Sequence, residues 1–305
     1  MVNGAGNMWS KCGAMVNILS VLKMIVAVFF LSILPVPSHI QGKILYSVNL
    51  YADERAESEW VKRAMALEKL QDWKGLIDWC RKWTKNEPKN AVAWCSLGFA
   101  YGKNKRYKDA IDAFRQGLRI NPEDAMSWYN LGVNYADIKR YSDSNDALRQ
   151  ALRINPEYVD AWVNLGANFA DLKRYSDAIE AYRQILQINP EYAYAWYNLG
   201  NTYGKTKRFS DAIDAFRQCL RINPKYANAW INLGANYADL ERYSDAIKAY
   251  HQGLRINPED AFAWHNLVVA YTLSGNRTAA LDAVQELRHL DPERADKLFN
   301  EIVPR

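Results

Sequence analysis

Asparagine recurs in this chain at a fixed spacing, each time directly before a leucine. The stretches read SWYNLG, AWVNLG, AWYNLG, AWINLG and AWHNL, and their asparagines are Asn130, Asn164, Asn198, Asn232 and Asn266. A carboxamide has two donor hydrogens and an acceptor oxygen, so it can pair with the N–H and the C=O of a peptide backbone at once. These residues therefore offer hydrogen bonding to an extended partner. The alternative is that they only keep an exposed helix face soluble.

The residues that usually carry catalysis or bind metal ions form no such pattern. The histidines are His39, His251, His265 and His289, and no pair of them has metal-ligand spacing with a third partner. The sequence has no glycine-rich phosphate loop and no nucleophile-turn motif. We therefore expect no catalytic residue, no cofactor and no metal ion, and we expect that the protein is not an enzyme.

Two other residue types keep a single period along the chain. Prolines stand at Pro88, Pro122, Pro156, Pro190, Pro224, Pro258 and Pro292, and tryptophans at Trp60, Trp94, Trp128, Trp162, Trp196, Trp230 and Trp264. Both series advance in steps of 34 residues. A constant period in this range indicates a solenoid of stacked repeats, in which each repeat buries its apolar face against its neighbours.

Each repeat predicts two helices. In residues 159–192 the first half places Trp162, Leu165, Gly166 and Phe169 at i, i+3, i+4 and i+7, which is one face of a helix. Ser176 is the expected N-cap of the second helix. Pro190 is expected to end that helix, because proline cannot continue it.

The recurring residues carry a family resemblance. In residues 193–226 they are Trp196, Leu199, Gly200, Tyr203, Ala212, Phe216 and Pro224. This pattern resembles the tetratricopeptide repeat, and the resemblance covers residues 57–294. It implies an all-α fold, a right-handed superhelical solenoid of helix-turn-helix repeats. It also implies that the first helix of each repeat lines a concave groove.

The period divides the chain into six full repeats and two ends. The full repeats are expected at 91–124, 125–158, 159–192, 193–226, 227–260 and 261–294. The stretch 57–90 keeps only Trp60 and Pro88 of the pattern, so we expect a degenerate N-terminal repeat there. Residues 295–305 are expected to form a capping segment, because the terminal repeats of a solenoid would otherwise expose core.

Helix geometry assigns the asparagines to one side of the first helix. With 100° per residue, repeat positions 2, 6, 9 and 13 lie together, opposite the apolar positions. In the family that the chain resembles, this side faces the groove. The candidate groove residues are Asn130, Asn164, Asn198, Asn201, Asn232, Asn266, Tyr194, Asp137, Asp160, Asp171, Asp239 and Phe262.

The chemistry of this side restricts the partner. The row of asparagines is similar to the asparagine ladder in the repeat domain of O-linked N-acetylglucosamine transferase, which implies that it holds an extended peptide. Positions 2, 5, 6 and 9 of the full repeats carry no Lys or Arg, which argues against a clamp for a C-terminal carboxylate. The four acids among the groove residues favour a neutral or basic peptide by charge complementarity.

Basic dipeptides recur between the two predicted helices of a repeat, at 105–106, 139–140, 173–174 and 207–208. They are either solvated turn charges or contacts for an anionic surface such as lipid headgroups or nucleic acid. The net charge of +5 is small, and nucleic-acid binding needs basic residues clustered on one face. We therefore expect no nucleic-acid partner.

The N-terminal segment has a different composition. Residues 24–34 form an uncharged apolar run that follows two lysines. This pattern predicts that 1–42 is a secretory signal peptide, and the alternative is a membrane anchor over residues 14–34. Residues 43–56 would then be a linker. Both alternatives place the repeats outside the cytoplasm, either secreted or periplasmic or anchored to a membrane.

The cysteines of the repeats are Cys80, Cys95 and Cys219. Their spacing matches no metal site, so we expect small buried residues. A disulfide between Cys80 and Cys95 is the open alternative.

Together these features predict a non-catalytic scaffold that binds a protein or peptide partner along the groove of the first helices. The alternative function is that of a membrane-anchored adaptor, whose basic inter-helix turns contact lipid or another anionic surface.

Overall fold

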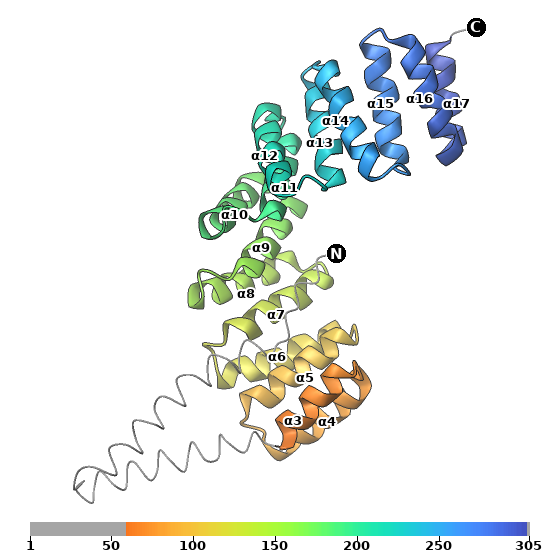
Figure 1. The fold of residues 1–305 in the computed structure, drawn as a ribbon. Coiled ribbons are helices and arrows are strands. Elements are labelled where there is room, and N and C mark those ends of the chain that lie inside the picture. Colours follow the sequence, from red (N-terminus) through yellow and green to blue (C-terminus); the bar gives the residue numbers. More distant parts are fainter. Residues whose placement is uncertain (1–58, 304–305) are drawn as a thin grey trace, which may run out of the picture. The chain divides into compact units, whose positions relative to one another are not determined.

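A computed structural model describes residues 59–303 of the chain, drawn as a ribbon in Figure 1. The segments predicted as signal peptide or anchor, 1–42, and as linker, 43–56, lie outside the described residues. Residues 59–303 fold into α-helices joined by turns, with no strand among them. The prediction of an all-α fold is therefore confirmed.

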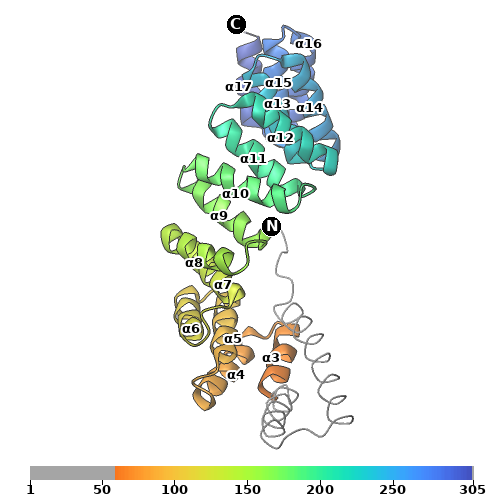
Figure 2. The same ribbon diagram turned by 90° about the vertical axis from the view of Figure 1, so that its left-hand side faces the viewer.

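The described chain divides into an N-terminal body, residues 59–154, and a C-terminal body, residues 155–303. The N-terminal body contains α3 (Glu59–Lys69), α4 (Trp73–Asn86), α5 (Ala91–Lys103), α6 (Tyr107–Ile120), α7 (Ala125–Asp137) and α8 (Tyr141–Ile154). The C-terminal body contains α9 (Val159–Asp171), α10 (Tyr175–Ile188), α11 (Ala193–Lys205), α12 (Phe209–Ile222), α13 (Ala227–Asp239), α14 (Tyr243–Ile256), α15 (Ala261–Leu273), α16 (Arg277–Leu290) and α17 (Pro292–Ile302). Within each body successive helices pack against one another in chain order (Figures 1 and 2). The sequence pattern runs on without a break and did not predict the division into two bodies.

The same turn joins the two helices of each repeat. Between α11 and α12, Lys207 has a φ of 59°, in the left-handed region. The N–H of Lys207 donates to the carbonyl of Gly204, and the N–H of Arg208 donates to the carbonyl of Tyr203, both at 2.9 Å. This pair of bonds closes the C-terminus of a helix. The other left-handed residues are Gln71, Lys105, Lys139, Lys173, Glu241 and Gly275.

The arginine after the left-handed residue explains where the second helix begins. Arg208 lies over the Tyr203 ring, 4.4 Å from its centroid, and its Nε donates to Asp211 at 2.6 Å. The prediction that Ser176 caps the second helix of its repeat is wrong. That helix, α10, has Arg174 as its N-cap residue, which makes no side-chain capping bond. Arg174 occupies this position because it closes the preceding turn and stacks on Phe169.

Replacing Lys207 with glycine is expected to raise the free energy of unfolding by about 0.5–1 kcal/mol. Glycine removes the steric cost of a Cβ in the left-handed region. Part of this gain is offset, because glycine also increases the conformational entropy of the unfolded chain. The matched control is Lys205→Gly in α11, which should lower the free energy of unfolding by about 1 kcal/mol. Urea unfolding of both variants measures the difference. Equal losses in both variants would show that the left-handed position carries no strain.

The tryptophan of each full repeat ties the first helix to the turn before it. The indole Nε1 of Trp196 donates to the carbonyl of Pro190 at 2.9 Å. The same bond to the proline six residues earlier is made by Trp94, Trp128, Trp162, Trp230 and Trp264. The two residue types that keep the 34-residue period in the sequence are therefore hydrogen-bonded partners.

A close approach between the two helices of a repeat requires the glycine at repeat position 8. A Cβ on Gly200 would lie 2.9 Å from the ring of Phe216, which is fully buried. The last repeat, 261–294, has Val268 and Val284 at the two equivalent positions, and both are fully buried. A larger residue on the first helix is thus matched by a smaller one on the second.

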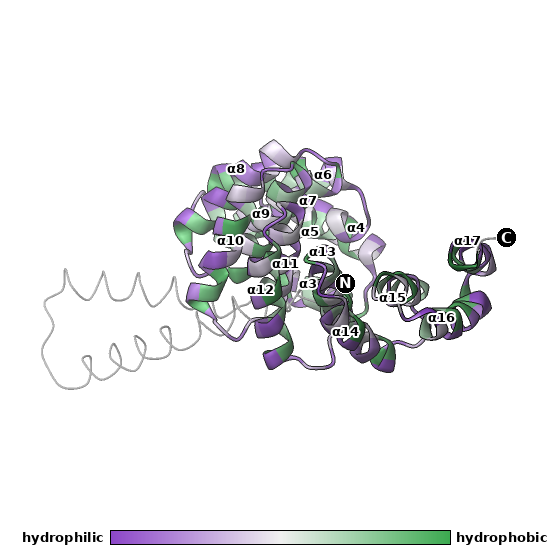
Figure 3. Ribbon diagram, turned by 90° about the horizontal axis from the view of Figure 1, so that it is seen from above, coloured by the Kyte–Doolittle hydropathy of each residue, from purple (hydrophilic) through white to green (hydrophobic). Residues whose placement is uncertain are grey.

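The hydropathy of α15 reflects its packing between other helices (Figure 3). Figure 3 shows α15 in green, hydrophobic along most of its length, while α14 and α16 carry both green and purple. α15 contacts α14, α16 and α17. Its buried residues are Ala263, Leu267, Val268 and Ala270.

The C-terminal end of the described chain is a capping helix. α17 begins at Pro292, which stands in its first turn, and Asp291 accepts from the N–H of Arg294 as its N-cap. The capping segment was predicted to begin at residue 295, because Pro292 was interpreted as the proline that ends a repeat. Proline fits the first turn of a helix, where its missing N–H has no intrahelical partner.

The cysteines are buried free thiols. Cys80, Cys95 and Cys219 form no disulfide, so the Cys80–Cys95 bridge is absent. Burial raises the pKa of Cys80 and of Cys95 to about 12. The thiols therefore stay protonated at neutral pH.

Candidate functional site

The structure places the predicted groove residues on the first helices of the repeats, and within each body we call the surface that carries them the first-helix face. Asn130 and Asp137 lie on α7 in the N-terminal body. The residues in the C-terminal body are Asp160, Asn164 and Asp171 on α9, Tyr194, Asn198 and Asn201 on α11, Asn232 and Asp239 on α13, and Phe262 and Asn266 on α15. The five asparagines of the repeating motif are all half-buried, while Phe262 is 55% exposed.

The asparagines do not all have free side chains. Asn164 donates to the carbonyl of Asp160 in its own helix at 2.8 Å. Asn232 donates to Oδ1 of Asn201 at 2.7 Å, which links α13 to α11. The carboxamides of Asn198 and Asn266 make no hydrogen bond with another residue in 59–303. The row therefore combines a structural contact with amides that remain open to a partner.

Four tyrosine rings gather on the C-terminal body beside these amides. Tyr197 stacks on Tyr226 with ring centroids 4.7 Å apart and also lies 6.5 Å from Tyr194. Tyr194 contacts Tyr192 edge to face at 6.4 Å. Sequence reasoning found only Tyr194, because Tyr192 and Tyr226 precede their helices and Tyr197 lies at a repeat position that was not assigned to the groove. We call Tyr192, Tyr194, Tyr197 and Tyr226 the tyrosine cluster.

Two of these tyrosines, Tyr192 and Tyr226, stand at the last position of their repeats, where other repeats have a helix-capping residue. Tyr158, Tyr192 and Tyr226 are the N-cap residues of α9, α11 and α13, and none makes a side-chain capping bond. The same position holds Asn90, Asp124 and Asp260 before α5, α7 and α15, and each of these does cap its helix. Giving up such a cap costs roughly 0.5–2 kcal/mol per helix.

The acids of the first-helix face also stand at unfavourable positions. Asp137, Asp171 and Asp239 are the last residues of α7, α9 and α13, are exposed, and form no ion pair within the described chain. Negative charge at a helix C-terminus opposes the helix dipole. Lys103 and Lys205 hold the equivalent, favourable place in α5 and α11. Partial burial of its carboxylate raises the pKa of Asp137.

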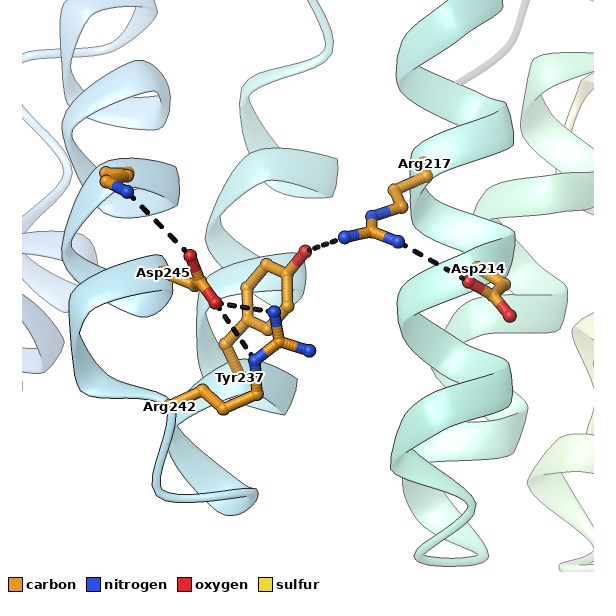
Figure 4. Close-up of polar contacts among 6 residues, drawn as sticks. Asp214, Arg217, Tyr237, Arg242 and Asp245 are labelled. Atoms are coloured by element: carbon orange, nitrogen blue, oxygen red, sulfur yellow. Dashed lines mark hydrogen bonds and ion pairs between the residues drawn. The ribbon is translucent and has the colours of Figure 1, made fainter.

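The basic turns, which were an alternative contact surface, are engaged internally. Figure 4 shows Tyr237 of α13 between two arginines. Arg217 of α12 donates to the Tyr237 hydroxyl at 2.8 Å. Arg242, from the turn before α14, lies 4.6 Å from the ring centroid and pairs with Asp245. The turn arginines Arg106, Arg140, Arg174 and Arg208 each pair with an aspartate three residues later.

Cavities on the side of the second helices repeat with the fold. A cavity of about 620 Å³ is lined by residues that include Trp230, Tyr237 and Lys248. Equivalent cavities of about 500 and 550 Å³ surround Trp128 and Trp196. Because the same lining recurs in successive repeats, these cavities follow from repeat geometry and do not single out one site.

Residues 59–303 contain no group of three His, Cys, Asp or Glu side chains placed to hold a metal ion. None of their helices has the length and apolar character needed to cross a membrane. The predicted anchor, 14–34, lies outside this range.

Family models match most of the repeats. The model of the cytochrome c-type biogenesis protein H TPR domain matches residues 71–192, and the tetratricopeptide repeat model matches residues 193–226 and 227–260. A search of curated proteins found no significant match.

Several solved structures are similar in fold. The crystal structure of MamA is 25% identical, with a TM-score of 0.52 over 54% of this chain and 97% of that one. The crystal structure of YrrB, titled a TPR protein with an unusual peptide-binding site, is 20% identical, with a TM-score of 0.54 over 61% and 96%. The C-terminal part of a TPR repeat-containing protein from Cytophaga hutchinsonii is 15% identical, with a TM-score of 0.69 over 78% and 98%. These likenesses support the predicted repeat solenoid.

Proposed function

Because the chain belongs to the tetratricopeptide repeat family, we propose that it is an interaction scaffold that binds an extended segment of a partner protein on the first-helix face. The observation that carries this proposal is the choice of residues at the two ends of α9 and α13. Tyrosines replace capping residues at the N-termini, and aspartates stand at the C-termini. Residues that break the local rules of stability are expected at functional sites, where binding compensates for their cost.

The chemistry of the face describes the partner segment. Half-buried amides can pair with a backbone in extended conformation, and Asn198 and Asn266 keep their carboxamides open to one. Asp171 and Asp239, which form no ion pair within residues 59–303, favour a neutral or basic segment. The fold shared with YrrB, a TPR protein described as having an unusual peptide-binding site, supports a peptide as the ligand.

A second candidate is a role in cytochrome c biogenesis. It rests on the match of residues 71–192 to the TPR domain of cytochrome c-type biogenesis protein H. The predicted export of the repeats, from the apolar run at 24–34, agrees with this candidate. Haem staining of the source cell's proteins tests it, because a cell that lacks this chain should then lose its covalent haem bands.

The adaptor that contacts an anionic surface through its basic turns receives less support. The arginines of these turns stack on aromatic rings and pair with aspartates, so only the lysines of the dipeptides remain free for such a surface. We keep membrane attachment through residues 14–34 as a proposal that is independent of the turns.

The proposed binding can be tested without knowing the partner. A random-sequence peptide library is selected on the full-length chain, and fluorescence polarisation measures the affinity of the enriched peptides. We expect micromolar binding by peptides rich in Lys or Arg that weakens as salt increases, since the contacts include exposed charges. Enrichment of acidic peptides, or of none at all, would overturn the proposal.

A further inference from the structure

One first helix, α11, departs from the others at three positions of its repeat. Tyr194, Tyr197 and Asn201 stand at repeat positions 2, 5 and 9 of residues 193–226. In the next repeat these positions hold Asn228, Ile231 and Ala235. No other full repeat combines two tyrosines with an asparagine there. Because the stacking of repeats does not require these three residues elsewhere, they indicate a local site on α11.

The tyrosine rings are held in place from below and remain partly open. Tyr197 contacts Phe216 edge to face, with ring centroids 6.0 Å apart, and Phe216 is fully buried. Tyr197 stacks on Tyr226 on one side and on Tyr194 on the other, at 4.7 and 6.5 Å. All four rings of the tyrosine cluster are half-buried. The cluster therefore presents a fixed aromatic surface to a ligand.

The hydrogen bonds beside these rings leave donors free. The Nδ2 of Asn232 donates to Oδ1 of Asn201 at 2.7 Å and to the Tyr197 hydroxyl oxygen at 3.4 Å. The Nδ2 of Asn201 and the hydroxyl hydrogen of Tyr197 have no partner within residues 59–303. Asn232 thus occupies acceptors of both residues, and the groups left to a ligand are mainly N–H and O–H donors.

Aromatic surface beside free donors matches proline. A proline has a carbonyl acceptor but no N–H, and its ring packs in grooves that aromatic side chains line. The partial positive charge of the donors complements the carbonyl oxygens. Other residues would bring an additional N–H, and sugar hydroxyls would bring further donors, for which the site offers fewer acceptors. A run of prolines is also extended before it binds, so it loses little entropy on binding.

We propose that the tyrosine cluster and Asn201 form a subsite for a proline-rich stretch of the partner segment in the polyproline II conformation. Proline rings pack against Tyr194 and Tyr226, and proline carbonyls accept from the Tyr197 hydroxyl and from Nδ2 of Asn201. This inference rests on the proposed function, because the stretch belongs to the segment that the first-helix face binds. It adds the residue type that sets the register of that segment.

The test uses synthetic probes on the full-length chain. Each probe is a fluorescein-labelled ten-residue peptide with Ser and Gly around four central residues, which are all Pro, all Ala, all Leu or all N-methylalanine. N-methylalanine lacks the N–H, as proline does, but has no ring. We expect the Pro probe to bind at least tenfold more tightly than the Ala and Leu probes, with the N-methylalanine probe between them, as measured by fluorescence polarisation.

Matched variants locate the effect. Tyr197→Phe keeps the ring but removes the hydroxyl donor, and Asn201→Asp keeps the acceptor for Asn232 but removes the free N–H donors. Each is expected to weaken the Pro probe about fivefold, the loss of one hydrogen bond. The control is Tyr243→Phe, which removes a half-buried tyrosine's hydroxyl at the start of α14 and should leave the affinity unchanged. Circular dichroism checks that each variant retains its helices.

Each other outcome counts against the subsite. Equal binding of the Pro and Ala probes would overturn it, as would tightest binding of the Leu probe, which would indicate only an apolar patch. An N-methylalanine probe as tight as the Pro probe, equal effects of Tyr197→Phe and Tyr243→Phe, or a failure of all probes to bind would do the same. The library selection judges the proposed function separately, and that function stands if peptides without proline bind the first-helix face.

Discussion

Replacing Gly234 with valine is expected to lower the free energy of unfolding by about 3 kcal/mol, an effect at the upper end for an overpacked core. A Cβ at Gly234 would lie 2.6 Å from the ring of Tyr250, whose side chain is 2% exposed. Neither helix can withdraw without breaking contacts with its neighbours. Urea unfolding followed by circular dichroism measures the loss.

The last repeat provides the control for this prediction. Its equivalent residues are Val268 and Val284, both fully buried. Tyr250→Val alone should cost about 3 kcal/mol through the cavity it leaves. The double variant Gly234→Val with Tyr250→Val should lose clearly less than the sum of the two single losses. Additive losses would mean that the two positions are not coupled.

Replacing Asn198 and Asn232 with alanine is expected to weaken the binding of a library-selected peptide at least 30-fold. The carboxamide of Asn198 can make two hydrogen bonds to a peptide backbone. The Nδ2 of Asn232 already donates to Asn201 and Tyr197, so Asn232 offers only its oxygen, for one further bond. A hydrogen bond contributes about 0.5–1.5 kcal/mol net. Two lost amides therefore correspond to about 2–3 kcal/mol, or roughly 30- to 150-fold in Kd. The bond from Asn232 to Asn201 is lost as well, so a loss of stability of about 1 kcal/mol accompanies the change.

The matched control removes two amides from the other side of the repeats. Gln218 and Gln252 line the cavities beside the second helices. Their replacement by alanine should leave peptide affinity unchanged within twofold. If replacing Asn198 and Asn232 leaves peptide affinity unchanged, these asparagines are scaffold residues. The proposal that amides of the first-helix face bind the peptide backbone would then be wrong.

The regular features of the fold could be predicted from the sequence because they depend on local geometry. The 34-residue period located the helix pairs, and the helix turn of 100° per residue placed the asparagines on one side. Ser176 was misassigned as a cap because the preference for serine at N-caps takes no account of the preceding turn. That turn requires Arg174 to close one helix and start the next.

The tyrosine cluster shows why part of the site was missed. Tyr197 occupies a repeat position that the helix projection did not assign to the groove, and Tyr192 and Tyr226 precede their helices. Their association depends on which repeats lie side by side, as in the stacking of Tyr197 on Tyr226. The last repeat position holds Tyr in some repeats and Asp or Asn in others. A comparison of this position between repeats would have found Tyr192 and Tyr226.

Site-specific photocrosslinking tests the central claim most directly. Benzoylphenylalanine is placed in the full-length chain at Ala167, exposed on α9 of the first-helix face, or at Asp214, exposed on α12. A library-selected peptide is added, the mixture is irradiated, and mass spectrometry identifies whether the peptide is crosslinked to the chain. Binding on the first-helix face predicts a crosslink from position 167 and none from position 214. A crosslink from position 214 alone would place the partner on the second helices and contradict the account.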